Sequence, residues 1–457
     1  MNTILVVLIL YLLFIFGLAW WLSRQETLSS YFLNRNNTGV WLFTFSNIAT
    51  VLGAGATTAI VAEVYRTGIS YGLALPISFI IGMIIMGFVA KKIREFGGKQ
   101  NAHTIVDFFG YRFDEKNRVL AGILQIFLLT IWTAAQAVAI GSLASVVTGI
   151  SYTFSLIIAA AITVLYTAVG GLKIDLITDF IQFWVIFGMF SILAAIGYFE
   201  VGGVSNLFAQ LPRGHLDPFA FGGIEWFVGI ILLSGFIYMG NSGHWQRIFS
   251  TQDAKTAQKG FFWTLPFLTI LSTLVLFIGF VSVVVLPSGV KGEKALFKLM
   301  ETTLPSWLVG VGFASILSVI MSSIDSLLVA GSTILYRAVY GEEKGSDTNN
   351  VLYARGVTAV FGAFGFTLAF LVPNIVTLSL LNTYLVLNFV PPIFAGLYSN
   401  ISADASFWAI LISSVVLFVL FPILGKDTFI INVPLCIFLT IGYDSFIEPY
   451  LPKRLKS

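Results

Sequence analysis

This chain of 457 residues has few charged side chains. Asp, Glu, Lys and Arg make up 10% of it, whereas a soluble domain carries about 25%. Hydrophobic residues account for 57%, and the mean hydropathy is +0.92. Long apolar stretches alternate with short polar loops and leave no soluble domain of useful size. The composition therefore excludes a soluble globular protein and predicts an integral membrane protein.

Cysteine and histidine are also scarce, and this limits the available chemistry. The single cysteine, Cys436, cannot form an internal disulfide, and the chain has three histidines. No H-E-x-x-H or Walker sequence is present. A G-x-S-x-G match at 68–72 lies at the edge of an apolar stretch, whereas this motif works on a strand-to-helix elbow. We therefore predict that the protein is not an enzyme.

The apolar stretches predict an all-α fold with a single transmembrane domain over 1–457. A spanning helix needs about 20 apolar residues. The first stretch has no basic segment before it and no cleavage site, so we expect it to span the membrane as well. The predicted spans are 2–22, 39–62, 69–90, 119–147, 152–168, 177–198, 222–246, 261–286, 306–338, 352–371, 375–396, 405–423 and 428–447.

Lysine and arginine are distributed unevenly between the predicted loops. With thirteen spans and the N-terminus outside, nineteen of the 25 basic residues fall in cytoplasmic segments and six in outer ones. Cytoplasmic loops are enriched in Lys and Arg. We therefore predict a protein of the cell membrane with its N-terminus outside and its C-terminus in the cytoplasm.

Glycine and polar residues interrupt two of the predicted spans. The first reads "FSNIATVLGAGATTA" from Phe45, and the second reads "GFIYMGNSGHWQR" from Gly235. The two interruptions lie five spans apart, as in transporters that are built from inverted repeats and bind solute near the membrane midplane. We predict repeats at 39–198 and 222–396, with extra helices at 2–22 and 405–447. Alternatively, the glycines only allow close helix packing.

Three stretches resemble signatures of the sodium:solute symporter family. They are "YTAVGGLKIDLITDFIQ" (166–182), "GHWQRIFSTQDAKTAQKG" (243–260) and "SVIMSSIDSLLVAGSTIL" (318–335). The resemblance implies a fold of the leucine-transporter type, alternating access and Na⁺-driven uptake of a small organic solute.

The same resemblance implies a first Na⁺ site between the first broken helix and the span at 306–338. Its ligands would be the backbone carbonyls of Phe45, Ile48 and Val319 and the hydroxyls of Ser322 and Ser323. Oxygen ligands suit a hard cation such as Na⁺. Alternatively, the two serines bond only to their own helix.

Some members of the family have a second Na⁺ site, which here would involve Asp179, Ser322 and Ser326. Asp325 is an additional carboxylate in this neighbourhood and departs from the family pattern. A carboxylate at the centre of a membrane helix costs about 2.5–3.5 kcal/mol and therefore needs a partner. We predict that this partner is Na⁺. A hydrated vestibule or a proton would be the alternatives.

The solute is expected to bind between the two broken helices and their neighbours. No arginine or lysine falls in the middle of a predicted span, so we do not expect a guanidinium clamp around a large anion. Tyr238 resembles a solute-lining tyrosine of the proline-transporting branch, but Asn47 replaces an aspartate of that branch. Each candidate could equally bond to a neighbouring helix. The candidate solute ligands are Asn47, Thr57, Thr58, Gln136, Tyr238, Asn241 and Ser242, and the candidate gate residues are His244, Trp245, Tyr384 and Asn388.

Together these features predict a Na⁺-coupled symporter that imports an amino acid, sugar, monocarboxylate or vitamin. Its expected partners are the solute, Na⁺ and the lipid bilayer, without nucleic acid, and we expect it to function as a monomer. The alternative is a Na⁺-permeable channel or a solute sensor on the same fold, because broken helices also line pores.

Overall fold

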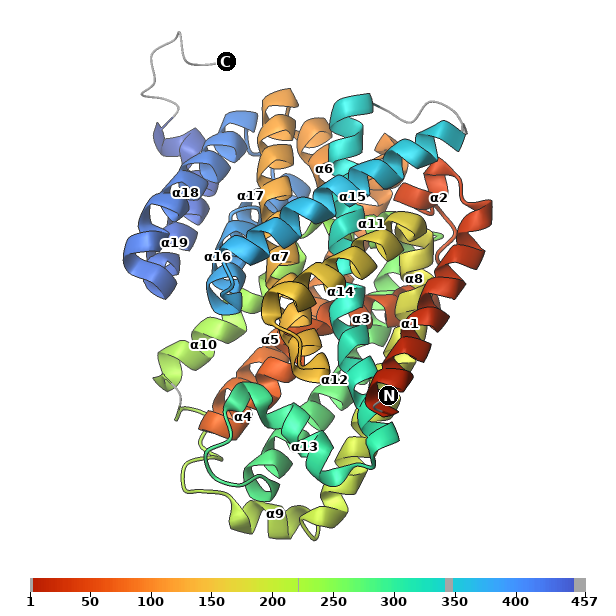
Figure 1. The fold of residues 1–457 in the computed structure, drawn as a ribbon. Helices are drawn as coiled ribbons and strands as arrows, with labels where there is room; N and C mark the ends of the chain where they lie inside the picture. Colours follow the sequence, from red (N-terminus) through yellow and green to blue (C-terminus); the bar gives the residue numbers. More distant parts are fainter. Residues whose placement is uncertain (1–2, 221, 342–347, 448–457) are drawn as a thin grey trace.

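The computed structural model describes residues 3–220, 222–341 and 348–447, which form a bundle of helices (Figure 1). The α-helices are α1 (Thr3–Leu22), α2 (Leu28–Phe32), α3 (Val40–Ala56), α4 (Thr58–Thr67), α5 (Ile69–Gln100), α6 (Ile105–Arg112), α7 (Glu115–Thr148), α8 (Tyr152–Glu200), α9 (Val204–Gln210), α10 (Gly223–Ser234), α11 (Ser242–Ser250), α12 (Ala254–Val285), α13 (Ala295–Thr303), α14 (Ser306–Tyr340), α15 (Thr348–Leu371), α16 (Ile375–Leu387), α17 (Val390–Tyr398), α18 (Ala403–Leu424) and α19 (Phe429–Gly442). Short 3₁₀ turns η1 (Ser23–Gln25), η2 (Gly235–Tyr238), η3 (Gly292–Lys294) and η4 (Gly425–Thr428) and a π-helical turn η5 (Tyr443–Ile447) complete the described chain.

Helix α14 lies at the centre of the bundle. In the most apolar part of α14, 83% of the residues are buried, compared with 17% for α1 and 28% for the stretch that holds α18 and α19. Helices α1, α3, α7, α8 and α15 pack around α14, while α18 and α19 lie at one edge of the bundle (Figure 1). Residues on α14 can therefore contact several helices at once, and this position favours it as part of a binding site.

The outer helices expose large apolar side chains. Phe14 and Trp21 of α1 are 57% and 65% exposed, and Ile423 of α18 is 73% exposed. Such extensive apolar exposure is unusual for a soluble monomer. It fits contact with lipid tails, so the structure agrees with the predicted membrane protein.

The number of spans stays a prediction. Among the described residues, nine helical stretches are long and apolar enough to cross a membrane, or eleven when each of two bent pairs counts as one span. Two of the nine, 152–200 and 403–447, are much longer than a single span needs. The prediction of thirteen spans divides each of these two stretches into two spans. In the structure, regular α-helix is interrupted within each stretch, at Gly171 and at Gly425.

The two interrupted helices expected from the sequence are both bent. Residues Val40–Gly53 meet Thr58–Thr67 at 48°, and Gly223–Tyr238 meet Ser242–Ser250 at 49°. Gly53 has a non-helical backbone, and a Cβ atom there would lie 3.2 Å from both Gln136 Nε2 and Ser323 Oγ. The close approach of these side chains explains the glycine. The inverted repeat itself stays a prediction.

A third break divides α8 at Gly171. This glycine has φ +59°, and a Cβ atom would lie 2.6 Å from a ring carbon of Tyr31. A left-handed backbone and a tight contact therefore both favour glycine here. Carbonyl groups just before the break find side-chain donors. The Tyr31 hydroxyl donates to Ala168 O at 3.0 Å, and Arg355 donates to Val169 O at 3.3 Å.

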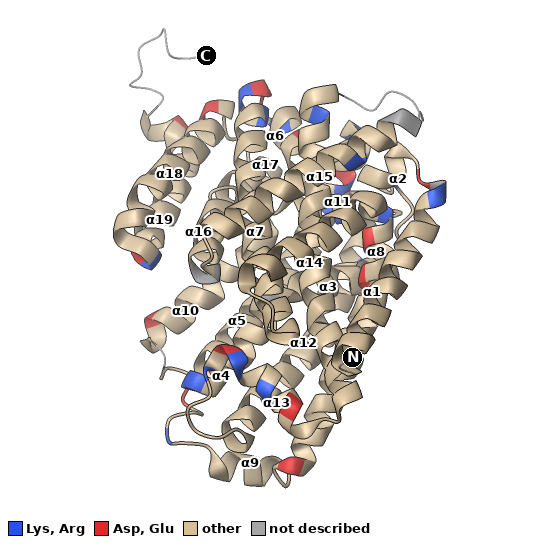
Figure 2. Cartoon of the chain, viewed as in Figure 1, with Lys and Arg blue, Asp and Glu red and all other residues tan. Residues whose placement is uncertain are grey.

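Lysine and arginine gather at the two ends of the bundle (Figure 2). One end holds α2 and α6, and the other holds α9 and α13 (Figure 1). Lys99 at the end of α5 and Lys291 before η3 are both exposed. The native cysteine, Cys436, is fully buried and should give little background in thiol labelling.

Labelling of new cysteines tests the predicted orientation. In whole cells, a membrane-impermeant maleimide should modify Lys291→Cys, and it should modify Lys99→Cys only after permeabilisation. The reason is that residue 291 belongs to a predicted outer loop and residue 99 to a cytoplasmic one. The reverse pattern would show that the orientation is inverted.

Candidate ion and solute site

The break in α3 faces two serines of α14. Ser322 Oγ donates to Ala49 O at 2.8 Å, and Ser323 Oγ lies 3.2 Å from Thr50 O. Both hydroxyls also lie 3.2 Å from Val319 O in their own helix. Three carbonyls and two hydroxyls therefore converge within the bundle. This set of neutral oxygen donors suits a hard monovalent cation.

The carbonyls that face the serines differ from those expected. The resemblance implied Phe45 and Ile48, whereas the serine hydroxyls contact the carbonyls of Ala49 and Thr50, which lie nearer to Gly53. The Phe45 ring stacks on Phe183 at 4.6 Å and packs against further aromatic rings. Of the other expected ligands, the hydroxyls of Ser322 and Ser323 both contact Val319 O. The position of Gly53 in the sequence could have indicated Ala49 and Thr50. They lie in the helical turn just before this break, where carbonyls are released from the hydrogen bonds of their own helix.

A buried arginine lies next to this site. Arg247 of α11 is fully buried, and its Nη2 lies 2.9 Å from Asp175 Oδ2 and 2.8 Å from Asp179 Oδ2. Its Nε donates to Ser46 Oγ at 3.1 Å, and Nη2 also donates to Ser326 Oγ at 2.5 Å. The sequence placed Arg247 just beyond the span at 222–246. Arg247 therefore lies outside the middle of every predicted span, as expected, but the structure places its guanidinium inside the bundle beside the candidate site.

The residues proposed for the second Na⁺ site are divided between two environments. Asp179 Oδ2 accepts from Ser46 at 2.7 Å and from Thr50 at 3.3 Å in addition to Arg247. Asp325 instead accepts from Thr167 Oγ1 of α8 at 2.5 Å. The described residues give no hydrogen bond that joins Asp325 to the Asp179 group. Asp175, which is not among the site residues expected from the sequence, shares Ser326 and Arg247 with that group.

Side chains from the two broken helices bond to each other. Asn47 Oδ1 of α3 lies 3.1 Å from His244 Nδ1 of α11, and Asn47 Nδ2 donates to Thr264 Oγ1 of α12 at 3.3 Å. The His244 ring packs edge-on against Tyr238 with centroids 5.2 Å apart. Asn47, Tyr238 and His244 are all buried. The structure thus brings together two of the predicted solute ligands and one predicted gate residue.

The other predicted solute ligands lie at the breaks themselves. Asn241 caps α11 by accepting from Gly243 N at 2.7 Å, and Thr57 donates to Gly53 O at 3.2 Å. Thr58 begins α4, just after the first break. The Ser242 hydroxyl is buried and, among the described residues, has no hydrogen-bond partner. Gln136 lies beside Gly53.

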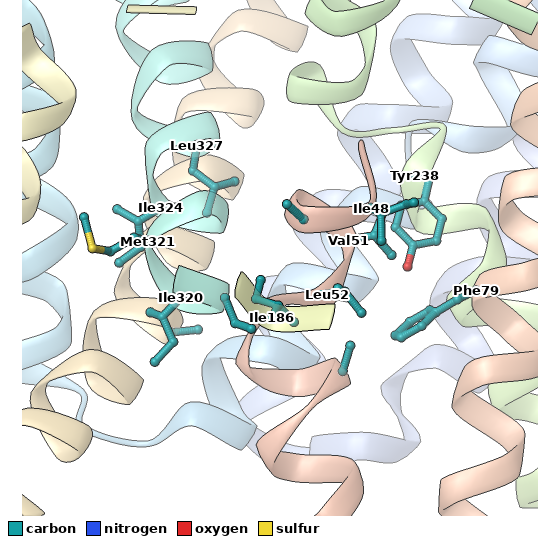
Figure 3. Close-up of a cluster of buried hydrophobic side chains, with 14 of the residues drawn as sticks. Ile48, Val51, Leu52, Phe79, Ile186, Tyr238, Ile320, Met321, Ile324 and Leu327 are labelled. Carbon is teal, nitrogen blue, oxygen red and sulfur yellow. The ribbon is translucent and has the colours of Figure 1, made fainter. Parts of the chain in front are cut away.

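Apolar side chains surround the first broken helix on both sides. Phe79 of α5 packs against Tyr238 with centroids 6.0 Å apart. Val51 and Leu52 of α3 point toward this pair (Figure 3). On the other side of α3 are the α14 residues Ile320, Met321, Ile324 and Leu327 (Figure 3). The polar atoms at the break are therefore few and lie in an apolar setting, as in sites for small organic ligands.

The predicted gate residues fall into two groups. His244 and Trp245 lie at the second break, where Trp245 Nε1 donates to Met239 O at 2.8 Å. Tyr384 donates to Lys426 O at 2.6 Å, and Asn388 accepts from Asn432 Nδ2 at 2.8 Å. The last two gate candidates therefore contact the connection between α18 and α19, and α19 itself, rather than the broken helices.

One residue at the second break was missed. Gln125 of α7 donates to Gly240 O at 2.8 Å and is fully buried. The signal in the sequence was a glutamine within a predicted span. Because glutamine often bonds one membrane helix to another, this signal alone did not indicate which backbone group Gln125 would contact.

A helical bundle with two bent spans and an oxygen-lined site beside one of them defines a secondary transporter of the broken-helix type. A profile of the sodium:solute symporter family matches residues 31–413, and the chain belongs to this family. It is not an enzyme, and its family indicates Na⁺ as the coupling ion.

Relatives and solved structures agree with this assignment. A sodium/pantothenate symporter of Haemophilus influenzae is 29% identical, over 75% of this chain and 73% of its own length. A sodium/proline symporter of Staphylococcus aureus is 28% identical, over 74% of this chain and 69% of its own length. The structure of a Na⁺-coupled sialic acid symporter in an outward-open state matches 98% of both chains with a TM-score of 0.82 and 20% identity. This likeness confirms the expected fold.

Arg247→Met should strongly destabilise the protein. It leaves two buried carboxylates without their cation, and the loss of one partner of a buried ion pair costs about 3–5 kcal/mol. The matched control is Arg66→Met, which removes a partly exposed pair with Glu63 and should cost about 0–1 kcal/mol. Unfolding of both variants in detergent measures the difference. If Arg247→Met and Arg66→Met had equal stabilities, a structural role for the buried ion pairs of Arg247 would be contradicted.

Proposed function

We propose that this protein imports a small organic solute together with Na⁺ by alternating access. The observation that carries the proposal is the contact of Ser322 and Ser323 with the carbonyls of Ala49 and Thr50 at the break in α3. A Na⁺ ion bound there would join α3 to α14. Family membership supports Na⁺ as the ion.

The first break offers a physical route for coupling. Gly53 is in close contact with Ser323, a proposed Na⁺ ligand, and with Gln136, a proposed solute ligand. Ion and solute would therefore bind to the same short piece of backbone. An ion that holds this piece in one conformation also favours the solute that binds this conformation, and the effect is reciprocal.

The solute proposed first is a small molecule with one carboxylate. Pantothenate, proline and sialic acid, which the relatives and the matched structure are named for, each carry one. In this chain the Nη2 of Arg247 is already paired with two aspartates, and among the described residues its buried Nη1 has no hydrogen-bond partner. The amino ends of α4 and α11 lie at the two breaks and provide backbone N–H groups and helix dipoles for a carboxylate.

A second Na⁺ near Asp179, Ser322 and Ser326 stays a prediction. Arg247 already bonds to Asp179 and Ser326. An ion at this position would have to share these oxygens with the guanidinium or replace it.

Na⁺ should stabilise the purified protein and increase its affinity for the solute. A coupling free energy of about 1–3 kcal/mol corresponds to about 5–150-fold in affinity. A thermal-shift screen with amino acids, sugars, monocarboxylates and vitamins, in Na⁺ and in choline, identifies the solute and measures the coupling. Equal solute binding in both salts would contradict Na⁺ coupling. Solute flux that is not tied to Na⁺ would favour a channel, and binding without flux would favour a sensor.

Ser322→Ala and Ser323→Ala should each raise the Na⁺ concentration needed for half-maximal stabilisation. Each variant removes one oxygen ligand, while the carbonyl ligands remain. The matched control is Ser332→Ala, because this serine is buried in the same helix but, among the described residues, bonds only to Val329 O of its own helix. If the two variants and the control had the same Na⁺ dependence, the proposed first site would be wrong.

A further inference from the structure

Three hydroxyl groups lie along one side of α8. Thr163, Tyr166 and Thr167 are spaced three and four residues apart, so they project from the same face of this helix. All three are at least 97% buried. They precede the break at Gly171 and face α14, because Thr167 Oγ1 lies 2.5 Å from Asp325 Oδ1.

Several oxygen atoms in this group lack partners. Among the described residues, Asp325 Oδ2, the Tyr166 hydroxyl and Thr163 Oγ1 are buried without a hydrogen bond. Buried polar groups are nearly always satisfied, so each exception needs an explanation. The Tyr166 hydroxyl is near enough to Asp325 to interact with its carboxylate as a weak hydrogen-bond donor, without the geometry of a full hydrogen bond. One oxygen of the Asp325 carboxylate and two hydroxyls on the face of α8 that meets it therefore lack partners, which points to a ligand.

The charges around Asp325 indicate what this ligand is. Asp325 is 1% exposed, and the described residues place no lysine or arginine in contact with it. The guanidinium of Arg247 is bonded to Asp175 and Asp179, and both of these carboxylates lie within electrostatic range of Asp325. Three buried carboxylates therefore lie near a single buried guanidinium. The negative charge of Asp325 is not balanced by it, so a cation is needed.

We propose that Asp325, Thr163, Tyr166 and Thr167 bind a monovalent cation, with Na⁺ as the expected ion. The donors are oxygens from one carboxylate and three hydroxyls, a set that suits a hard cation of low charge. This inference rests on the proposed Na⁺ coupling. It places Asp325 in a different site from Asp179, whereas the sequence predicts one site for both.

The two proposed ions would bind on different sides of α14. Ser323 and Asp325 are two residues apart, which turns them about 200° around a helix. Ser323 contacts α3, whereas Asp325 contacts α8. One central helix would therefore hold one ion against each of two neighbouring helices.

Binding of radioactive Na⁺ to the purified full-length protein tests the inference without knowledge of the solute. The wild type should bind one Na⁺ more than Asp325→Asn does. Tyr166→Phe and Thr163→Val should keep the number of ions but raise the half-saturating Na⁺ concentration of one of them several-fold. The control variant Ser191→Ala removes an α8 hydroxyl that, within the described part of the chain, bonds only to Phe187 O of its own helix. It should bind Na⁺ as the wild type does.

The first site provides the comparison that separates this inference from the proposed function. Ser323→Ala should weaken the binding of the ion at the first site and leave the affinity for the ion at Asp325 unchanged. If Asp325→Asn bound as many ions as the wild type while Ser323→Ala weakened one, the inference would be overturned and the proposed function would stand. A protonated Asp325 would give this result. A wild type that bound no Na⁺ would overturn both.

Folding of the variants is checked by thermal unfolding. If Asp325→Asn did not fold, Tyr166→Phe and Thr163→Val would decide the question, because each removes only a hydroxyl or exchanges it for a methyl group. Half-saturating concentrations equal to that of the wild type in both variants would overturn the inference.

Discussion

A backbone group that leaves its helix inside a membrane must find another hydrogen-bond partner, and the centre of this protein is arranged around that constraint. At the second break, Trp245 bonds to Met239 O and Gln125 bonds to Gly240 O. At the first, serines of α14 bond to the carbonyls of Ala49 and Thr50. Each break is therefore tied to a neighbouring side chain. The same oxygens can be offered to an ion, because serine hydroxyls and carbonyls serve as ligands as well as hydrogen-bond partners.

The buried arginine connects these elements through charge. Arg247 lies on the half-helix that follows the second break, and it bonds to two aspartates of α8 and to serines of α3 and α14. Four helices thus meet at one guanidinium. A movement of α11 during alternating access would have to keep these ion pairs or exchange them for others, because an unpaired charge in the membrane is costly. The pairs therefore limit how far α11 can move by itself.

The position of α14 explains why the proposed binding chemistry gathers there. It is the most buried of the long apolar helices in the described chain, and α3 and α8 both pack against it. Its serines and its aspartate face different neighbours. A change in how α3 or α8 packs on α14 would alter the oxygens around each proposed ion, which links ion binding to helix packing.

The sequence by itself determined the membrane location, the positions of the apolar helices, the two broken helices and the family resemblance. Hydropathy and glycine placement act locally along the chain, so these features can be deduced from spacing alone. Only the tertiary structure decided which groups meet. It showed that the serines of α14 contact the carbonyls of Ala49 and Thr50, that Arg247 lies between Asp175 and Asp179, and that Asp325 bonds to Thr167. The bend of each broken helix and its rotation against α14 and α8 set these contacts, and they depend on packing between segments far apart in the sequence.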